Sequence, residues 1–169
     1  GEVDLTGGTL ETSITGGNTT ISGNVGVDDT VGSIASAVSV ATGAKLTTKA
    51  DNVTGAINNG GNLDLTGGDI KNAISGDGNT TISGTVTNTT GSVIGNAVTV
   101  ATTGNLTTAA DKLGGAVENN GTTNGLTLTG GQLSQNVTGT GKTVIAGTDV
   151  SVKYGNSIAQ DIEITSGNK

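Results

Sequence analysis

The chain has 169 residues, of which 31 are Gly and 32 are Thr, and it contains no Cys, His, Trp, Phe, Met or Pro. This composition excludes a core filled by aromatic and Met side chains, and the missing His and Cys remove the commonest catalytic bases and nucleophiles. The formal net charge is −7 and Arg is absent, so no basic surface is available for nucleic-acid phosphates.

Short apolar–polar blocks open the chain and are separated by Gly-rich turns. Leu5-Thr6-Gly7-Gly8 is followed by Asn18-Thr19-Thr20-Ile21-Ser22-Gly23 and then by Ala37-Val38-Ser39-Val40-Ala41-Thr42. Apolar residues recur at every second position, which is the period of a strand. Gly and Asn at the block ends favour turns because both tolerate positive φ.

The Ala-rich stretch over residues 33–44 is the strongest rival for a helix. Its β-branched Val38 and Val40 and its Ser and Thr neighbours disfavour that helix, and Gly32 and Gly43 bracket the stretch. We therefore expect a strand here as well.

The same blocks return in the second part of the chain. Residues 65–68, 79–84 and 97–102 repeat the three blocks, and Leu128-Thr129-Gly130-Gly131 begins them again. The sequence therefore predicts one repeat array over residues 1–169, with copies at 1–60, 61–123 and 124–169, the last being partial. We expect this array to be a fragment of a longer protein.

Short alternating strands, with turn signals at intervals of roughly 8 to 12 residues, predict an all-β fold. We expect a right-handed parallel β-solenoid (β-helix) of roughly 20-residue coils, with about three coils filling each repeat period. An antiparallel β array is the alternative. In a solenoid no coil buries its inward side chains alone, so the core consists of small aliphatic layers. The core residues expected in the middle copy are Leu63, Leu65, Ile70, Ile74, Ile82, Val86, Val98 and Val100.

The order of these blocks resembles the repeats in passenger regions of bacterial autotransporter adhesins, a type V secreted family. The resemblance rests on Leu-x-Leu-Thr-Gly-Gly, then Asn-Thr-Thr-Ile-Ser-Gly, then Ala-Val-x-Val before a Gly. It implies a secreted β-solenoid displayed on the bacterial cell surface. The membrane β-barrel that such families carry is not part of this sequence.

Two segments hold the residues nearest to known site motifs. Residues 136–143 end in Gly-Lys-Thr like a phosphate loop, but Asn136 stands where its first Gly belongs and no helical pattern follows, so we expect a simple turn. Asp28-Asp29 is the one adjacent carboxylate pair, and we expect it to lie in a solvated loop. We expect no catalytic residue, no metal site and no cofactor, and the ligand-binding residues stay unknown.

Polar residues at matched repeat positions form a second group of candidates. Asn58-Asn59 and Asn119-Asn120 are expected to satisfy the backbone of turns, with a polar recognition strip as the alternative. Outward residues at equivalent positions are expected to line up as exposed rows. One row would contain Asp4, Asp64 and Thr127, and the other Ser39, Thr99 and Glu163.

The function expected is that of a non-enzymatic structural and adhesive stalk segment on a bacterial surface or in a secreted protein. Its partners would be a host or neighbouring-cell surface, either protein or glycan, or other copies of itself. Nucleic-acid binding and membrane insertion are not expected. One alternative is a self-assembling extracellular filament or matrix subunit, and a remote one is an ice-binding solenoid.

Overall fold

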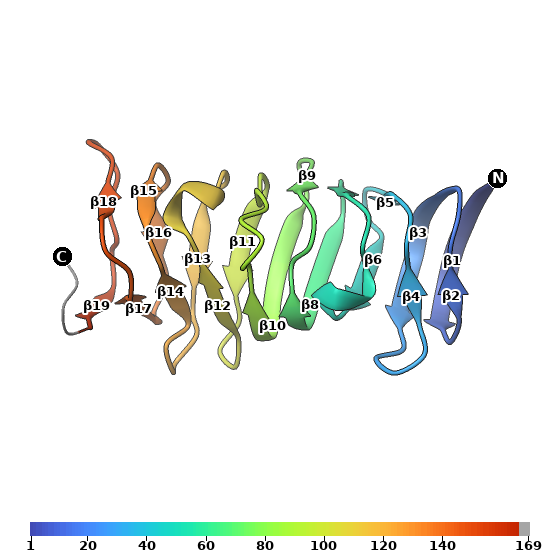
Figure 1. Cartoon of the computed structure of the whole chain (residues 1–169), viewed down its shortest axis with the longest axis horizontal. Coiled ribbons are helices and arrows are strands. Elements are labelled where there is room, and N and C mark those ends of the chain that lie inside the picture. Colours follow the sequence, from blue (N-terminus) through green and yellow to red (C-terminus); the bar gives the residue numbers. More distant parts are fainter. Residues whose placement is uncertain (166–169) are drawn as a thin grey trace.

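The computed structural model describes residues 1–165, which form a rod with its coils stacked along the long axis (Figure 1). Two short 3-10 turns interrupt the strands, η1 (Ala50–Asn52) and η2 (Ala110–Lys112). The strands are β1 (Glu2–Leu10), β2 (Ser13–Ile14), β3 (Asn18–Val27), β4 (Ser33–Ile34), β5 (Val38–Val40), β6 (Lys45–Thr48), β7 (Ile57–Asn59), β8 (Asn62–Asp69), β9 (Ile74–Ser75), β10 (Asn79–Thr87), β11 (Ala97–Val100), β12 (Asn105–Thr108), β13 (Val117–Asn119), β14 (Leu126–Leu128), β15 (Gly131–Leu133), β16 (Val137–Thr138), β17 (Lys142–Ile145), β18 (Val150–Val152) and β19 (Asp161–Ile164).

The strand pairs of the described residues are parallel, and the stacked coils lie about 19 residues apart along the chain. Val38 pairs with Ile57, and Val98 pairs with Val117. About nine turns stack in this way, and at the usual strand spacing they make a rod about 40 Å long. The predicted all-β parallel solenoid and its approximate coil length are confirmed, and the antiparallel alternative is wrong. The right-handed sense of the coil stays a prediction.

Inward side chains stack in rows that run along the rod, and three of these, one for each face, are called rows 1 to 3. Row 1 contains Thr19, Val38, Ile57 and Ile74. Row 2 contains Val25, Leu46, Leu63, Thr80, Val98, Val117 and Val137. Row 3 contains Val86, Leu106, Leu126, Thr143 and Ile162. All eight core residues predicted for the middle copy are buried, with exposed fractions of 3% or less.

The sequence repeat does not match a whole number of coils. Leu5 pairs with Ile21, Ile21 with Val40, and Val40 with Asn59, so three coils carry the chain from Leu5 only as far as Asn59. Leu65, the repeat equivalent of Leu5, lies beyond Asn59 by about one third of a coil. The expected number of about three coils per period is therefore right as an approximation, but three coils fall short of the period by about one third of a coil. One copy spans about three and one third coils.

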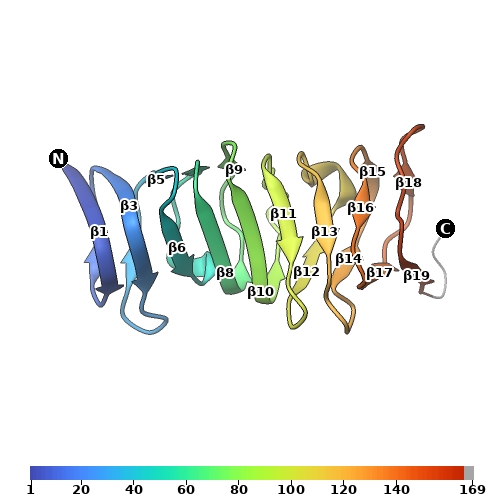
Figure 2. The same cartoon turned by 180° about the vertical axis from the view of Figure 1, so that it is seen from behind.

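Each successive copy is consequently rotated about the rod axis by one row. The equivalent residues Thr19, Thr80 and Thr143 fall in rows 1, 2 and 3. The two 3-10 turns, which are also repeat equivalents, lie on opposite edges of the rod (Figure 1, cyan and gold). The reverse view shows the same uninterrupted stack of strands from end to end (Figure 2).

A polar layer at this matched Thr interrupts each of rows 1 to 3. Thr19, Thr80 and Thr143 are fully buried. Thr19 Oγ1 lies 2.9 Å from Ser36 Oγ, and Thr80 Oγ1 donates to Asn96 Oδ1 at 3.0 Å. Thr143 Oγ1 lies 2.5 Å from the side-chain amide of Gln160. Because Thr has the shape of Val, the layer keeps its packing while each hydroxyl finds a partner on the next coil.

Candidate functional site

The outward side chains form rows whose members differ from those expected. Asp4 lies in a row with Thr20, Ser39 and Asn58. Asp64 lies in a row with Thr81, Thr99 and Glu118. Thr127 lies with Thr107, Val144 and Glu163, and Val144 is buried. The expected rows of repeat equivalents are therefore wrong, because each copy is rotated to its own face of the rod.

A Ser–Asp contact bridges neighbouring coils in the first two copies. Ser22 Oγ donates to Asp4 Oδ1 at 2.6 Å, and Ser83 Oγ donates to Asp64 Oδ1 at 2.5 Å. The third copy has Thr127 and Ala146 at these places, so both partners change together. This outward pair ties neighbouring coils together.

The Asn pairs at the matched turns form hydrogen bonds with backbone groups. Asn59 and Asn119 are fully buried. Their Oδ1 atoms accept the N–H of Gly61 and Gly121 at 3.1 Å. Their Nδ2 atoms donate to carbonyls on the next coil, at Asn79 and Lys142. The turn-satisfying interpretation is confirmed for both residues. In the structure Asn119 is the equivalent of Asn59, because both make the same contacts. The sequence repeat had matched Asn119 to Asn58, one position earlier.

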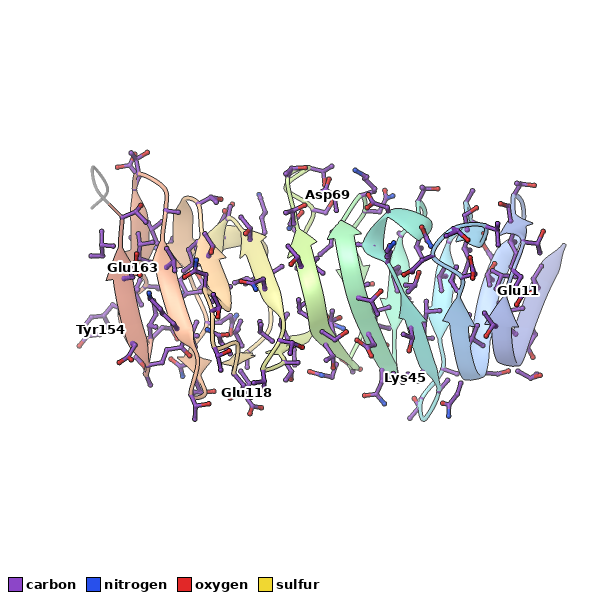
Figure 3. All side chains as sticks on the ribbon, turned by 90° about the horizontal axis from the view of Figure 1, so that it is seen from below. Glu11, Lys45, Asp69, Glu118, Tyr154 and Glu163 are labelled. Carbon is purple, nitrogen blue, oxygen red and sulfur yellow. The ribbon has the colours of Figure 1, made fainter. Side chains whose placement is uncertain are left out.

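The densest group of charges is the charged edge, which we define as Asp28, Asp29, Lys49, Asp51, Asp69 and Lys71. Lys49 Nζ lies 3.4 Å from Asp29 Oδ2. Lys71 Nζ contacts two carboxylates, Asp51 at 3.5 Å and Asp69 at 2.9 Å. Figure 3 shows Asp69 at the rim of the rod. Sequence reasoning missed the Asp69–Lys71 network, although the i, i+2 spacing of its two charges was a visible signal.

Asp69 is the most strongly stabilised carboxylate of this edge. Partial burial acts to raise the pKa of Asp69, but hydrogen bonds outweigh that effect. The Thr89 N–H and hydroxyl, the Thr87 hydroxyl and the Lys71 ammonium all donate to the carboxylate. They hold the pKa of Asp69 well below its usual range. The same contact with Asp69 raises the pKa of Lys71.

The Asp28-Asp29 pair caps and anchors its own loop. The Asp28 carboxylate accepts hydrogen bonds from the Thr30 hydroxyl and from the backbone N–H groups of Thr30 and Val31. These hydrogen bonds, led by that of the Thr30 hydroxyl, lower the pKa of Asp28. The loop is exposed, so the expected solvated loop is confirmed, and within it Asp29 pairs with Lys49.

The segment that resembles a phosphate loop is a turn between β16 and β17. Lys142 contacts the Glu163 carboxylate, and Thr143 is buried in row 3. The Gly141 N–H donates to the Asn119 carbonyl at 2.8 Å. A strand follows in place of the helix whose N-terminus would hold a phosphate. The simple-turn interpretation is confirmed.

Among residues 1–165, no group of three or more His, Cys, Asp or Glu side chains is placed to hold a metal ion, and no helix is long and apolar enough to span a membrane. A small recess beside η1 is lined mainly by apolar side chains, including Val53, Ile57 and Ile74. No family model, curated protein or solved structure matches the chain.

Proposed function

We propose that this chain is a structural and adhesive stalk segment of a bacterial surface or secreted protein, without enzymatic activity. Its partners would be proteins or glycans on a neighbouring surface, met through many weak contacts. The observation that carries this proposal is the continuous stack of about nine coils, whose outward rows hold short polar side chains.

The rod geometry supports a stalk. Each copy of the repeat adds about three and one third coils, or about 16 Å of length at the usual strand spacing. Copy number therefore sets how far the rod projects. Because successive copies are rotated, equivalent outward groups face different directions, so several copies present their surface around the whole rod. Such an arrangement suits weak multivalent attachment better than a single tuned pocket.

Two measurements test the two parts of this proposal. Small-angle scattering of rods with three, six and nine copies should show the maximum dimension rising by about 16 Å per copy. Beads coated with these rods should bind one class of glycan or matrix protein on an array, with retention rising more steeply than copy number. A length that does not scale would overturn the stalk, and failure to bind any arrayed surface would overturn the adhesive part.

Self-assembly into an extracellular filament or matrix is the second candidate. The coils of this rod stack through parallel strand pairs, and coils of separate chains would stack through contacts of the same kind. Analytical ultracentrifugation separates the candidates, because a filament subunit lengthens with concentration whereas a stalk segment stays monomeric.

A further inference from the structure

An Asn side chain reacts most readily with its own backbone where Gly follows it, because Gly has no side chain to hinder the next amide nitrogen. The chain contains three such pairs, Asn59-Gly60, Asn120-Gly121 and Asn124-Gly125. In this reaction the backbone nitrogen of the Gly attacks the side-chain carbonyl carbon of the Asn. It therefore needs a backbone N–H without a partner and a side-chain amide that is free to turn. The fold places the three pairs in different surroundings.

The first pair is held by hydrogen bonds inside the rod. Asn59 is fully buried, and its amide accepts the Gly61 N–H at 3.1 Å and donates to the Asn79 carbonyl at 2.9 Å. The Gly60 N–H, which would be the nucleophile, donates to the Val40 carbonyl at 2.8 Å. Both reacting groups would have to break hydrogen bonds before they could meet.

The second pair is held in a similar way, although it lies nearer the surface. The Asn120 amide donates to the Glu118 carboxylate at 2.9 Å and accepts the Thr140 N–H at 3.2 Å. The Gly121 N–H donates to Oδ1 of the buried Asn119 at 3.1 Å. The nucleophile and the amide of this pair are therefore both engaged as well.

The third pair lies in the loop between β13 and β14, which projects from the edge of the rod (Figure 1). The Asn124 side chain is exposed, and within residues 1–165 neither its amide nor the Gly125 N–H has a hydrogen-bond partner. Asn124 has a left-handed φ of 51°, a conformation that Asn and Asp adopt more readily than most side chains. A nucleophile without a partner thus lies next to a solvated amide.

We propose that Asn124 is a site of spontaneous deamidation, with water as the only co-reactant. The Gly125 nitrogen bonds to the side-chain carbonyl carbon of Asn124, and the bond from that carbon to Nδ2 breaks. Nδ2 takes up the proton from the Gly125 nitrogen and leaves as ammonia, so a cyclic imide remains. Water then adds to one of the two imide carbonyls, and one of its protons returns to the nitrogen. This proposal is independent of the stalk function.

The two hydrolysis products differ in their effect on the coil. Opening at the side-chain carbonyl gives an aspartyl residue, which keeps the left-handed backbone and adds one negative charge. Opening at the main-chain carbonyl gives an isoaspartyl residue, whose main chain is one atom longer. Gly125 has no space to accept this atom, because even a Cβ there would lie 2.3 Å from Asn119 Oδ1. The isoaspartyl product should therefore displace the Gly125 carbonyl, which accepts the buried Leu106 N–H at 2.9 Å.

Peptide mapping by mass spectrometry tests the site. The full chain is incubated in mildly alkaline buffer, folded or in urea, and the mass gain from amide to acid is followed at each Asn-Gly pair. In the folded chain Asn124 should react at least about tenfold faster than Asn59 and Asn120, whose nucleophiles must first break a hydrogen bond. In urea the three rates should become similar, because the dipeptides are identical. A smaller difference in the folded chain, or a preference for Asn124 that persists in urea, would overturn the proposal.

Hydrogen exchange of the incubated rods tests the effect on the coil. Amide exchange of Leu106 should become faster in the isoaspartyl fraction of the parent. Asn124→Gly accepts the positive φ but has no amide, so its Leu106 exchange should stay slow after the same incubation. Asn124→Asp carries the charge without the longer main chain, and before incubation it should exchange like the unmodified parent. Unchanged Leu106 exchange in the isoaspartyl fraction, or equally fast exchange in fresh Asn124→Asp, would overturn the link between the longer main chain and the Leu106 hydrogen bond.

Discussion

Thr80 Oγ1, within row 2, donates a 3.0 Å hydrogen bond to Asn96 Oδ1 in a turn of the next coil, and both side chains are buried. Asn96 Nδ2 has no partner among the described residues. The first copy places Ser36 where the second has Asn96, and the Ser36 and Thr19 hydroxyl oxygens are partners at 2.9 Å. Both side-chain oxygens of this layer thus have a partner in the first copy, whereas the second copy buries an amide nitrogen that has none.

Replacing Thr80 by Val should destabilise the rod by about 1–3 kcal/mol, because the Asn96 amide then loses its only side-chain partner while staying buried. The double variant Thr80→Val/Asn96→Ala should recover part of that loss. Urea unfolding of the single and double variants measures both effects. Additive losses in this cycle would contradict a direct coupling between the two side chains.

Asn59→Ala should also cost about 1–3 kcal/mol, since it leaves the buried Gly61 N–H and the Asn79 carbonyl without their side-chain partner. The neighbouring Asn58 is exposed and provides a matched control. Asn58→Ala should change the free energy of unfolding by less than about 0.5 kcal/mol. Equal effects at the two positions would show that the amide of Asn59 is not what holds the turn.

Val98→Asp should disrupt the rod locally and lower its melting temperature strongly, because the variant buries an unpaired charge in row 2. Ala97→Asp places the same charge one residue away on the exposed side of β11 and should melt close to the parent. Thermal unfolding followed by circular dichroism compares them. Similar melting of Val98→Asp and the parent would mean that Val98 does not face inward.

Acid should weaken the rod through Asp69. Its pKa in the folded chain is depressed below the ordinary value of 3.8, so its stabilising effect is complete above about pH 4 and is lost as the pH falls through the folded pKa. Asp69→Asn should therefore be less stable than the parent by about 1–3 kcal/mol at pH 7. The difference should shrink steadily below about pH 4. A gap of constant size under increasingly acid conditions would contradict this role.

The fold could be predicted from the sequence because it depends on the alternation of apolar and polar residues and on the turn residues between the strands. Leu63, Leu65 and Ile82 belong to alternating blocks between Gly-rich turns, and all are buried as predicted. The rotation of successive copies about the rod axis could not be predicted from these patterns. The repeat period is a number of residues along the chain, whereas the length of each coil decides which residues stack on one another. Coil length also varies, because the coil from Leu46 to Leu63 is shorter than the coil from Leu106 to Leu126.

The buried polar contacts were the second feature that could not be predicted from the sequence. Alternation alone places Thr80 on the inward side, but its partner Asn96 lies in a turn of the next coil with no periodic signal. Lys71 likewise meets Asp51 only because η1 brings that carboxylate over the next coil. Such contacts depend on how coils stack, and the stacking register is a property of the whole rod.

Disulfide formation tests the stacking most directly, since the chain has no Cys of its own. Ser39 and Asn58 are paired residues on the outer side of adjacent coils. The double variant Ser39→Cys/Asn58→Cys should therefore form an intramolecular disulfide on mild oxidation. Ser39 and Thr99 are repeat equivalents on different faces, so Ser39→Cys/Thr99→Cys should stay reduced in the monomer. A disulfide between positions 39 and 99 but none between 39 and 58 would contradict the parallel stack of coils.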